Sequence, residues 1–179
     1  MNADQLRHVL RAAAANTGEK VFVVIGSQAI LGSHPDAPRT LRRSVEGDTY
    51  PQQAPGKAIL IDGAIGEGSL FHQEFGYYAH GVAPDTAILP AGWEQRLVKF
   101  EVGDPAGTIG LCLEIHDLAF SKLAAGRDKD LEFVKDLLKH RLINRGRVDR
   151  LIEGDAKPQL KETLIRSWTI SKARLGAEL

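Results

Sequence analysis

The sequence predicts an α+β fold in which one helix and several strands come first and helices follow. Three observations support this prediction. Residues 21–25 (VFVVI) form an apolar run that is rich in β-branched side chains and too short for a helix, which is typical of a buried strand. Residues 96–102 and 108–115 have strand patterns and flank a turn with proline and glycine, so they predict an antiparallel hairpin. Beyond residue 116 the apolar side chains recur at helical spacing, so helices follow the strands.

The N-terminal segment, residues 2–16, has the pattern of a helix. Its apolar residues fall at positions i, i+3, i+4 and i+7, namely Leu6, Val9, Leu10 and Ala13. Asp4 lies near the positive end of this helix, where a carboxylate is favourable, and Gly18 is placed to end it. We expect this helix to cover the sheet beside the first strand.

Between the first strand and residue 82, short elements alternate with loops. The pattern predicts a short helix over 28–32, a proline-rich loop over 33–38, a strand over 44–48, a helix over 69–76 and a strand over 77–82. Residues 57–65 fit either a short helix or a strand, because periodicity does not separate the two in so short an apolar run.

The C-terminal part is predicted to be helical throughout. Asp117 is a candidate N-cap for a first helix that ends at Gly126, with Asp128 capping a second helix over 129–140. Alternatively, one helix continues through Gly126 at a cost of about 1 kcal/mol relative to alanine. Further helices are predicted over 145–153 and 158–175. We therefore expect an α/β core over 1–116 and a helical region over 117–179 that packs on it.

Composition limits the classes of protein that the chain can belong to. With 179 residues it is long enough for one domain with a substantial core. Lys+Arg and Asp+Glu are equal at 23 each, which argues against binding nucleic acid through net charge but not against a local basic patch. The single cysteine, Cys112, excludes an intrachain disulfide and a cysteine-clustered zinc site, and we interpret it as a buried core thiol. No apolar segment has the length of a signal core or a membrane span, so we expect a cytoplasmic protein and no membrane partner.

Two features near the first strand point to phosphate chemistry. The strand at 21–25 stops at Gly26-Ser27, and a turn between a strand and a helix start offers backbone N–H groups to an anion. In the alternating segment 44–48, Glu46 and Asp48 are two residues apart, so they share a face about 7 Å apart along the strand. Each feature alone also fits an ordinary turn or a solvated strand face. Together they are what metal-assisted phosphoryl or nucleotidyl transfer requires.

The basic residues allow two interpretations at the sequence level. Arg39, Arg42 and Arg43 lie between the turn and the carboxylates, where they either neutralise a polyphosphate or keep a loop soluble. A basic stretch over 135–150 either binds RNA or forms a solvated helical face. The histidines His72, His80 and His116 are too dispersed to predict a zinc site, so structural or surface roles are expected.

Three segments of the chain resemble the nucleotidyltransferase superfamily, specifically its AbiEii toxin-like branch and related uncharacterised bacterial proteins. They are Gly26-Ser27, SVEGD at 44–48 and HDLAFSKLAAGRDKDLEFV at 116–134, and the resemblance covers roughly residues 21–138. The resemblance implies a nucleotidyltransferase-like mixed sheet flanked by helices. It also implies transfer of a nucleoside monophosphate from a nucleoside triphosphate (NTP) to an RNA, protein or small-molecule acceptor. A toxin-type protein would have a cognate antitoxin.

The resemblance also implies roles for individual residues. Glu46 and Asp48 would hold Mg²⁺, which prefers oxygen ligands and keeps several waters. Lys122 would contact phosphate, and Asp130 would complete the catalytic set as a base or an orienting carboxylate. The residues that would bind the nucleotide are Gly26, Ser27, Arg42, Arg43, Lys122 and Arg127. Without the resemblance, the residues favour a solvated position for Lys122 on its helix, and Arg127 with Asp130 fits an ordinary surface pair at i, i+3.

The chain departs from the family pattern in three ways. The spacing from Ser27 to Asp48 exceeds that of the tightest family members, although the toxin-like branch tolerates it. Members usually carry aspartate where this chain has Glu46. A third carboxylate on a neighbouring strand is not assignable, since Glu101 and Glu114 are the only strand candidates. These departures keep an alternative open, a catalytically inactive binding or regulatory module on the same fold. A third hypothesis is an RNA-binding protein that uses the basic stretch.

Overall fold

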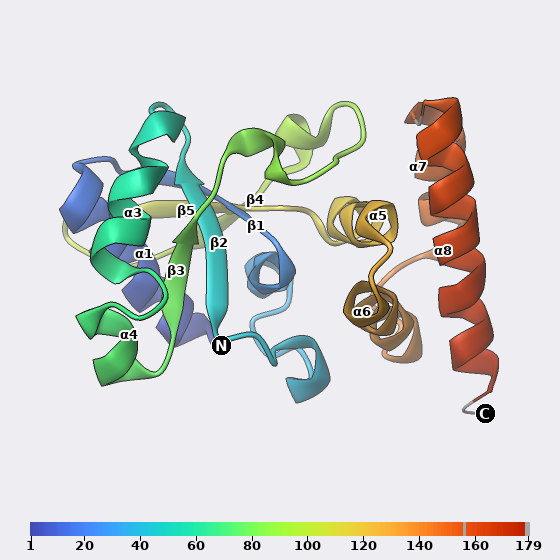
Figure 1. Cartoon of the computed structure of the whole chain (residues 1–179), viewed down its shortest axis with the longest axis horizontal. Coiled ribbons are helices and arrows are strands. Elements are labelled where there is room, and N and C mark those ends of the chain that lie inside the picture. The colour runs from blue at the N-terminus through green and yellow to red at the C-terminus, as the bar shows by residue number, and fades with distance from the viewer. Residues whose placement is uncertain (156, 178–179) are drawn as a thin grey trace. The chain divides into compact units, whose positions relative to one another are not determined.

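The computed structural model describes residues 1–155 and 157–177 of the chain (Figure 1). The chain forms two compact units. The first unit contains Met1–Ala87 and Arg96–Glu114, and the second contains Ile88–Gln95 and Ile115–Leu179. The first unit carries every strand that the structure describes, and the second carries four of the described α-helices.

The first unit is built around a five-stranded mixed sheet with the strand order β3-β2-β1-β5-β4 (Figure 1). The strands are β1 (Val21–Ile25), β2 (Glu46–Pro51), β3 (Tyr78–Gly81), β4 (Val98–Glu101) and β5 (Ile109–Cys112). β1 pairs with β2 antiparallel and with β5 parallel, while β2 pairs with β3 parallel. β4 and β5 form the predicted antiparallel pair. The predicted α+β class with a mixed sheet is therefore confirmed.

The first helix, α1 (Ala3–Thr17), lies one residue later at each end than the predicted 2–16. Asn2 is its N-cap, and Asn2 and Gln5 form a capping box in which each side chain accepts a hydrogen bond from the other residue's backbone N–H. Gly18 ends the helix in the left-handed conformation at φ 71°. The predicted apolar face is buried, namely Leu6, Val9, Leu10 and Ala13.

Three shorter α-helices complete the first unit. They are α2 (Ile30–Ser33), α3 (Ala58–Ile65) and α4 (Leu70–Phe75). The ambiguous segment 57–65 is therefore helical, and α3 packs on both α1 and β3. α4 is capped as predicted, because the Ser69 hydroxyl accepts a hydrogen bond from the His72 N–H and Gly76 closes the helix at φ 73°.

The second unit contains α5 (Ile115–Ala125), α6 (Asp128–Lys139), α7 (Arg145–Asp155) and α8 (Pro158–Gly176). Gly126, at φ 63°, separates α5 from α6, so the interpretation with two helices is correct. The predicted N-cap at Asp117 is wrong, because α5 begins two residues earlier and buries Asp117 in its first turn. Asp128 is likewise the first residue of α6 rather than its cap.

The four helices share an apolar core that matches the predicted spacing. Its fully buried residues include Leu118, Phe120, Leu123, Val134, Leu137 and Leu164. The Trp168 indole N–H donates a 2.7 Å hydrogen bond to an Asp149 carboxylate oxygen, which joins α8 to α7. Among the described residues, no helix combines the length and the apolar character that a membrane span needs.

Candidate metal-binding site on strands β2 and β3

Strand β2 presents Glu46 and Asp48 on one face of the sheet. The glycine between them faces the other way, because a Cβ on Gly47 would lie 3.6 Å from a Met1 side-chain atom and 3.8 Å from one of Val9. The strand starts at Glu46 and continues to Pro51, so it begins two residues later than predicted and extends further. The predicted sharing of a face by the two carboxylates is confirmed, since alternate residues of a strand point to the same side.

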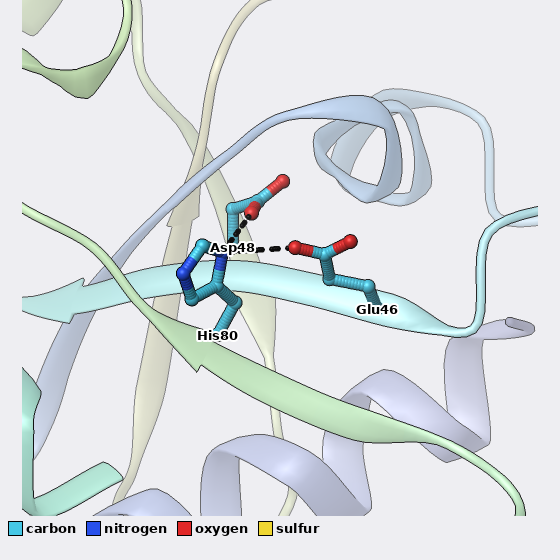
Figure 2. Close-up of side chains that lie close together, drawn as sticks. All are labelled: Glu46, Asp48 and His80. Atoms are coloured by element: carbon cyan, nitrogen blue, oxygen red, sulfur yellow. Dashed lines mark hydrogen bonds and ion pairs between the residues drawn. The ribbon is translucent and has the colours of Figure 1, made fainter. Parts of the chain in front are cut away.

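The histidine of strand β3 lies against both carboxylates. β2 and β3 run parallel with Asp48 opposite His80. The His80 Nδ1 atom is 2.8 Å from Glu46 Oε1 and 3.2 Å from Asp48 Oδ1, and Figure 2 shows the ring directed at both. Within the described part of the chain, these three residues form the one cluster of three or more His, Cys, Asp or Glu side chains whose ligand atoms lie within 4.8 Å of one another.

Burial and neighbouring charges shift the proton affinities in this cluster. Burial raises the pKa of the Asp48 carboxyl to about 6, helped by the charge of Glu46 and opposed by His80. For His80, burial alone would lower the pKa, but the hydrogen bond and charges of Asp48 and Glu46 outweigh it and raise the pKa. Two carboxylates this close favour a cation between them, and the raised pKa of His80 favours the cationic form of the imidazole at this position.

This arrangement predicts that Asp48→Asn stabilises the metal-free protein at alkaline pH. The folded-state pKa of Asp48 is raised, so its contribution to stability is present below about pH 4 and is lost as the pH rises through about 6. In the presence of a chelator at pH 8, we expect the free energy of unfolding of the variant to be about 1–2 kcal/mol higher than that of the wild type. At pH 5 the difference should become small, and urea unfolding at both pH values measures it.

The matched control is Asp36→Asn, which changes an exposed loop carboxylate. It should leave the free energy of unfolding unchanged within about 0.5 kcal/mol at both pH values. A wild type that is more stable than Asp48→Asn at pH 8 without metal would contradict the assigned electrostatics.

The turn after β1 brings its backbone against Asp48. Gly26 has φ 69° and ψ −170°, a conformation essentially restricted to glycine. A Cβ on Gly26 would lie 1.9 Å from the Asp48 Oδ2 atom, so only glycine fits. The structure thus brings together Gly26 and Asp48, two residues that sequence analysis assigned to one site.

The helix after this turn is too short for its dipole to attract a phosphate strongly. Ser27 opens a 3₁₀ turn (Ser27–Ala29), which continues into the four-residue helix α2. The Ala29 N–H donates to the Gly26 carbonyl, so one of the N–H groups expected to be free for an anion is in use. The helix dipole that we expected to favour an anion at Ser27 therefore contributes little.

Arg42, one of the predicted nucleotide contacts, carries a buried polar atom without a partner among the described residues. Its Nε atom is buried, and among the described residues it has no hydrogen-bond partner. The same holds for the Oε1 atom of Gln28, whose Nε2 donates to the Ser44 carbonyl at 2.9 Å. A buried, unpaired guanidinium N–H is costly, and the contact of Arg42 with a nucleotide stays a prediction. Arg43, in contrast, is exposed, and its predicted contact with the nucleotide stays a prediction.

Neither carboxylate proposed as a third acid belongs to the cluster. Glu101 lies on β4, which β5 and β1 separate from β2, and it pairs with Lys99 at 2.6 Å. Glu114 follows β5 and is not part of the described cluster either. The third position beside Glu46 and Asp48 is occupied by a histidine instead.

Lys122, Arg127 and Asp130 form a separate cluster inside the second unit. Asp130 is 1% exposed, and its carboxylate accepts from Lys122 Nζ at 3.1 Å and from the Arg127 Nε–H. Burial would raise the pKa of Asp130, but the Arg127 hydrogen bond and the Lys122 charge lower it below its usual value. Lys122 is 11% exposed and lies over the Phe133 ring. The interpretation of Lys122 as a solvated residue is therefore wrong, and its contact with phosphate stays a prediction.

Removal of the Asp130 carboxylate should destabilise the protein strongly. Asp130→Ala would leave the ammonium of Lys122 buried without its anion, for which we expect a loss of about 3 kcal/mol in the free energy of unfolding. The control is Asp4→Ala, which removes an i, i+3 pair with Arg7 at 2.7 Å in which Asp4 is 90% exposed. That change should cost less than about 1 kcal/mol. Equal losses in the two variants, measured by urea unfolding, would contradict the importance of the buried pair.

Sequence analysis missed His80 as a site residue. The strand at 77–82 was predicted, but the sequence gives no direct sign that it pairs with the strand that carries Glu46 and Asp48. The parallel register places Tyr78 opposite Glu46 and His80 opposite Asp48. The one signal present was that His80 alternates with the buried Ala79, which assigns it to the polar face of its strand.

A comparison with protein-family models finds a match that covers most of the chain. A family model described as "Nucleotidyltransferase of unknown function (DUF6036)" matches residues 4–168, which include both clusters. No curated protein and no solved structure matches the chain.

Proposed function

Because the chain belongs to the family of nucleotidyltransferases of unknown function (DUF6036), we propose that it transfers a nucleoside monophosphate from an NTP to an acceptor at a metal held by Glu46 and Asp48. The observation that supports this site is the contact of Asp48 with the Gly26 turn, where a Cβ would lie 1.9 Å from Asp48 Oδ2, while Glu46 and Asp48 both approach His80 Nδ1. The match to the family indicates the class of reaction, and the geometry supports Glu46 and Asp48 as the place where it occurs.

The residues present fit a divalent cation. Carboxylate oxygens are the ligands that Mg²⁺ and Mn²⁺ prefer, and Asp48 and Glu46 supply them from one face of β2. Burial, and after it the charge of Glu46, raises the pKa of Asp48, and a cation between the two carboxylates would offset the repulsion between them. When bound, the metal would neutralise negative charge on the phosphates of the nucleotide.

The surrounding residues would bind and orient the triphosphate. Gly26 keeps the backbone close to Asp48 without a side chain in the way, so the phosphates could approach the carboxylates. We propose Arg42 as a donor to a phosphate oxygen, which is supported by the absence of a hydrogen-bond partner for its Nε–H among the described residues. Ser27 and Arg43 complete the proposed nucleotide contacts, and Lys122, Arg127 and Asp130 of the second unit are proposed to serve the same reaction.

The finer assignment follows from the resemblance to the AbiEii toxin-like branch. We propose Mg²⁺ or a related divalent ion as the metal, an RNA, protein or small molecule as the acceptor, and a toxin-type role with a cognate antitoxin. Growth arrest on expression that requires Asp48, and its relief by the product of a neighbouring gene, would support this role.

The experiment for the transfer reaction uses each NTP labelled at the α-phosphate. The purified chain is incubated with a divalent metal and with RNA, protein or small-molecule fractions, and label transfer and pyrophosphate release are measured. We expect release of pyrophosphate in step with label transfer for the wild type and loss of both in Glu46→Gln. An inactive binding module, the alternative function, would bind a nucleotide without either product.

A further inference from the structure

We propose that His80 is the third protein ligand of this metal and that the resulting nitrogen–oxygen set makes the site prefer Mn²⁺ to Mg²⁺. The inference rests on the proposed function, because it concerns the metal that Glu46 and Asp48 hold. It goes beyond that function by assigning a ligand that the sequence pattern did not predict and by naming the class of metal ion.

The spacing of the three donor atoms supports a shared ion. His80 Nδ1 is 2.8 Å from Glu46 Oε1 and 3.2 Å from Asp48 Oδ1 (Figure 2). Two neighbouring ligands of an octahedral ion lie about 3 Å apart when each is about 2.1 Å from the metal. The distances from His80 Nδ1 to the two carboxylate oxygens therefore match the distance between adjacent ligands of one metal ion.

The backbone holds His80 in place for this role. β3 is paired with β2 along the register that sets His80 opposite Asp48. The next residue, Gly81, lies against α3, where a Cβ would be 2.0 Å from the Ala58 carbonyl, and its N–H donates to Asp62 Oδ1 at 2.9 Å. Strand pairing on one side and helix packing on the other thus fix the backbone that carries the imidazole, as a ligand site requires.

The donor chemistry determines which ion is favoured. Mg²⁺ binds oxygen ligands and retains several waters, so an imidazole adds little to its affinity. Transition metals accept imidazole nitrogen readily, and their affinity for a mixed site rises from Mn²⁺ towards Cu²⁺. Mn²⁺ also keeps the octahedral oxygen coordination that phosphates need. A histidine beside two carboxylates therefore favours a first-row transition ion over Mg²⁺, and Mn²⁺ is the member of that series whose preference for carboxylate and water ligands is nearest to that of Mg²⁺.

The test uses metal ions alone, without nucleotide. Calorimetry measures Mn²⁺ and Mg²⁺ affinity, and electron spin-echo modulation of bound Mn²⁺ detects directly coordinated ¹⁴N. In the wild type we expect ¹⁴N modulation and tighter binding of Mn²⁺ than of Mg²⁺. In His80→Asn the modulation should vanish and Mn²⁺ affinity fall at least about tenfold, while Mg²⁺ affinity changes little. His34→Asn, which alters a histidine hydrogen-bonded to the neighbouring Ser33, is the matched control and should behave like the wild type.

Two results would overturn the inference. One is bound Mn²⁺ in the wild type without nitrogen modulation, and the other is an equal loss of Mg²⁺ and Mn²⁺ affinity in His80→Asn, which would make His80 a positioning residue only. Either result leaves the proposed function standing if Asp48→Asn still abolishes metal binding. A metal that binds equally well to Asp48→Asn would count against the proposed function itself.

Discussion

Asp48→Asn is expected to lower the rate of nucleotidyl transfer at least about a hundredfold, which corresponds to about 3 kcal/mol of transition-state stabilisation. Asparagine keeps the shape of the side chain and can still accept a hydrogen bond from His80, but it removes the negative charge that holds the metal. Transfer of label from an α-labelled NTP, measured at saturating metal, gives the rate.

The stability of the same variant separates chemistry from folding. Because the metal-free variant should be more stable than the wild type at pH 8, a loss of activity cannot be attributed to unfolding. Asp36→Asn serves as the control for a carboxylate outside the site and should retain full activity. Full activity in Asp48→Asn would exclude this carboxylate from the reaction.

Gly26→Ala is expected to cost about 3 kcal/mol or more in the free energy of unfolding and to reduce activity at least about a hundredfold. The new Cβ would lie 1.9 Å from Asp48 Oδ2, so either the turn or the carboxylate must move by more than an ångström. The backbone conformation adds to the cost, because alanine rarely adopts φ 69° with ψ −170°. Urea unfolding and the rate per folded molecule measure the two effects.

Two controls isolate the contact with Asp48. Gly18 has a similar φ of 71°, but a Cβ added there would meet nothing within 4 Å, so Gly18→Ala should cost only about 1 kcal/mol and leave activity unchanged. In an Asp48→Ala background, where the carboxylate is gone, the cost of Gly26→Ala should fall by about 1 kcal/mol or more. An unchanged cost in that background would show that the turn and Asp48 are independent.

Most elements of the fold could be predicted because their signals are local. The capping box of α1, the apolar run of β1 and the glycines at 18, 76 and 126 each act within a few residues of the chain. Errors arose where tertiary burial overrides local preference. Asp117 has the chemistry of an N-cap, yet it is buried inside the first turn of α5.

The candidate site was predictable in part, for the same reason. Glu46 and Asp48 share a strand, so their common face follows from the period of a strand, and Gly26 follows directly from β1. His80 depends on a parallel pairing between segments 32 residues apart, which local patterns do not encode. The buried environment of Lys122 likewise depends on Asp130 of the following helix and could not be separated from a surface lysine by sequence alone.

The most direct test of the central claim is a calorimetric titration of NTP into the wild type and Asp48→Asn, with Mn²⁺ or with a chelator. If Glu46 and Asp48 hold the metal that binds the triphosphate, at least one NTP will bind to the wild type only with Mn²⁺, and Asp48→Asn will lose this binding. Equal NTP binding by both proteins, or binding by the wild type that is unaffected by the chelator, would contradict it.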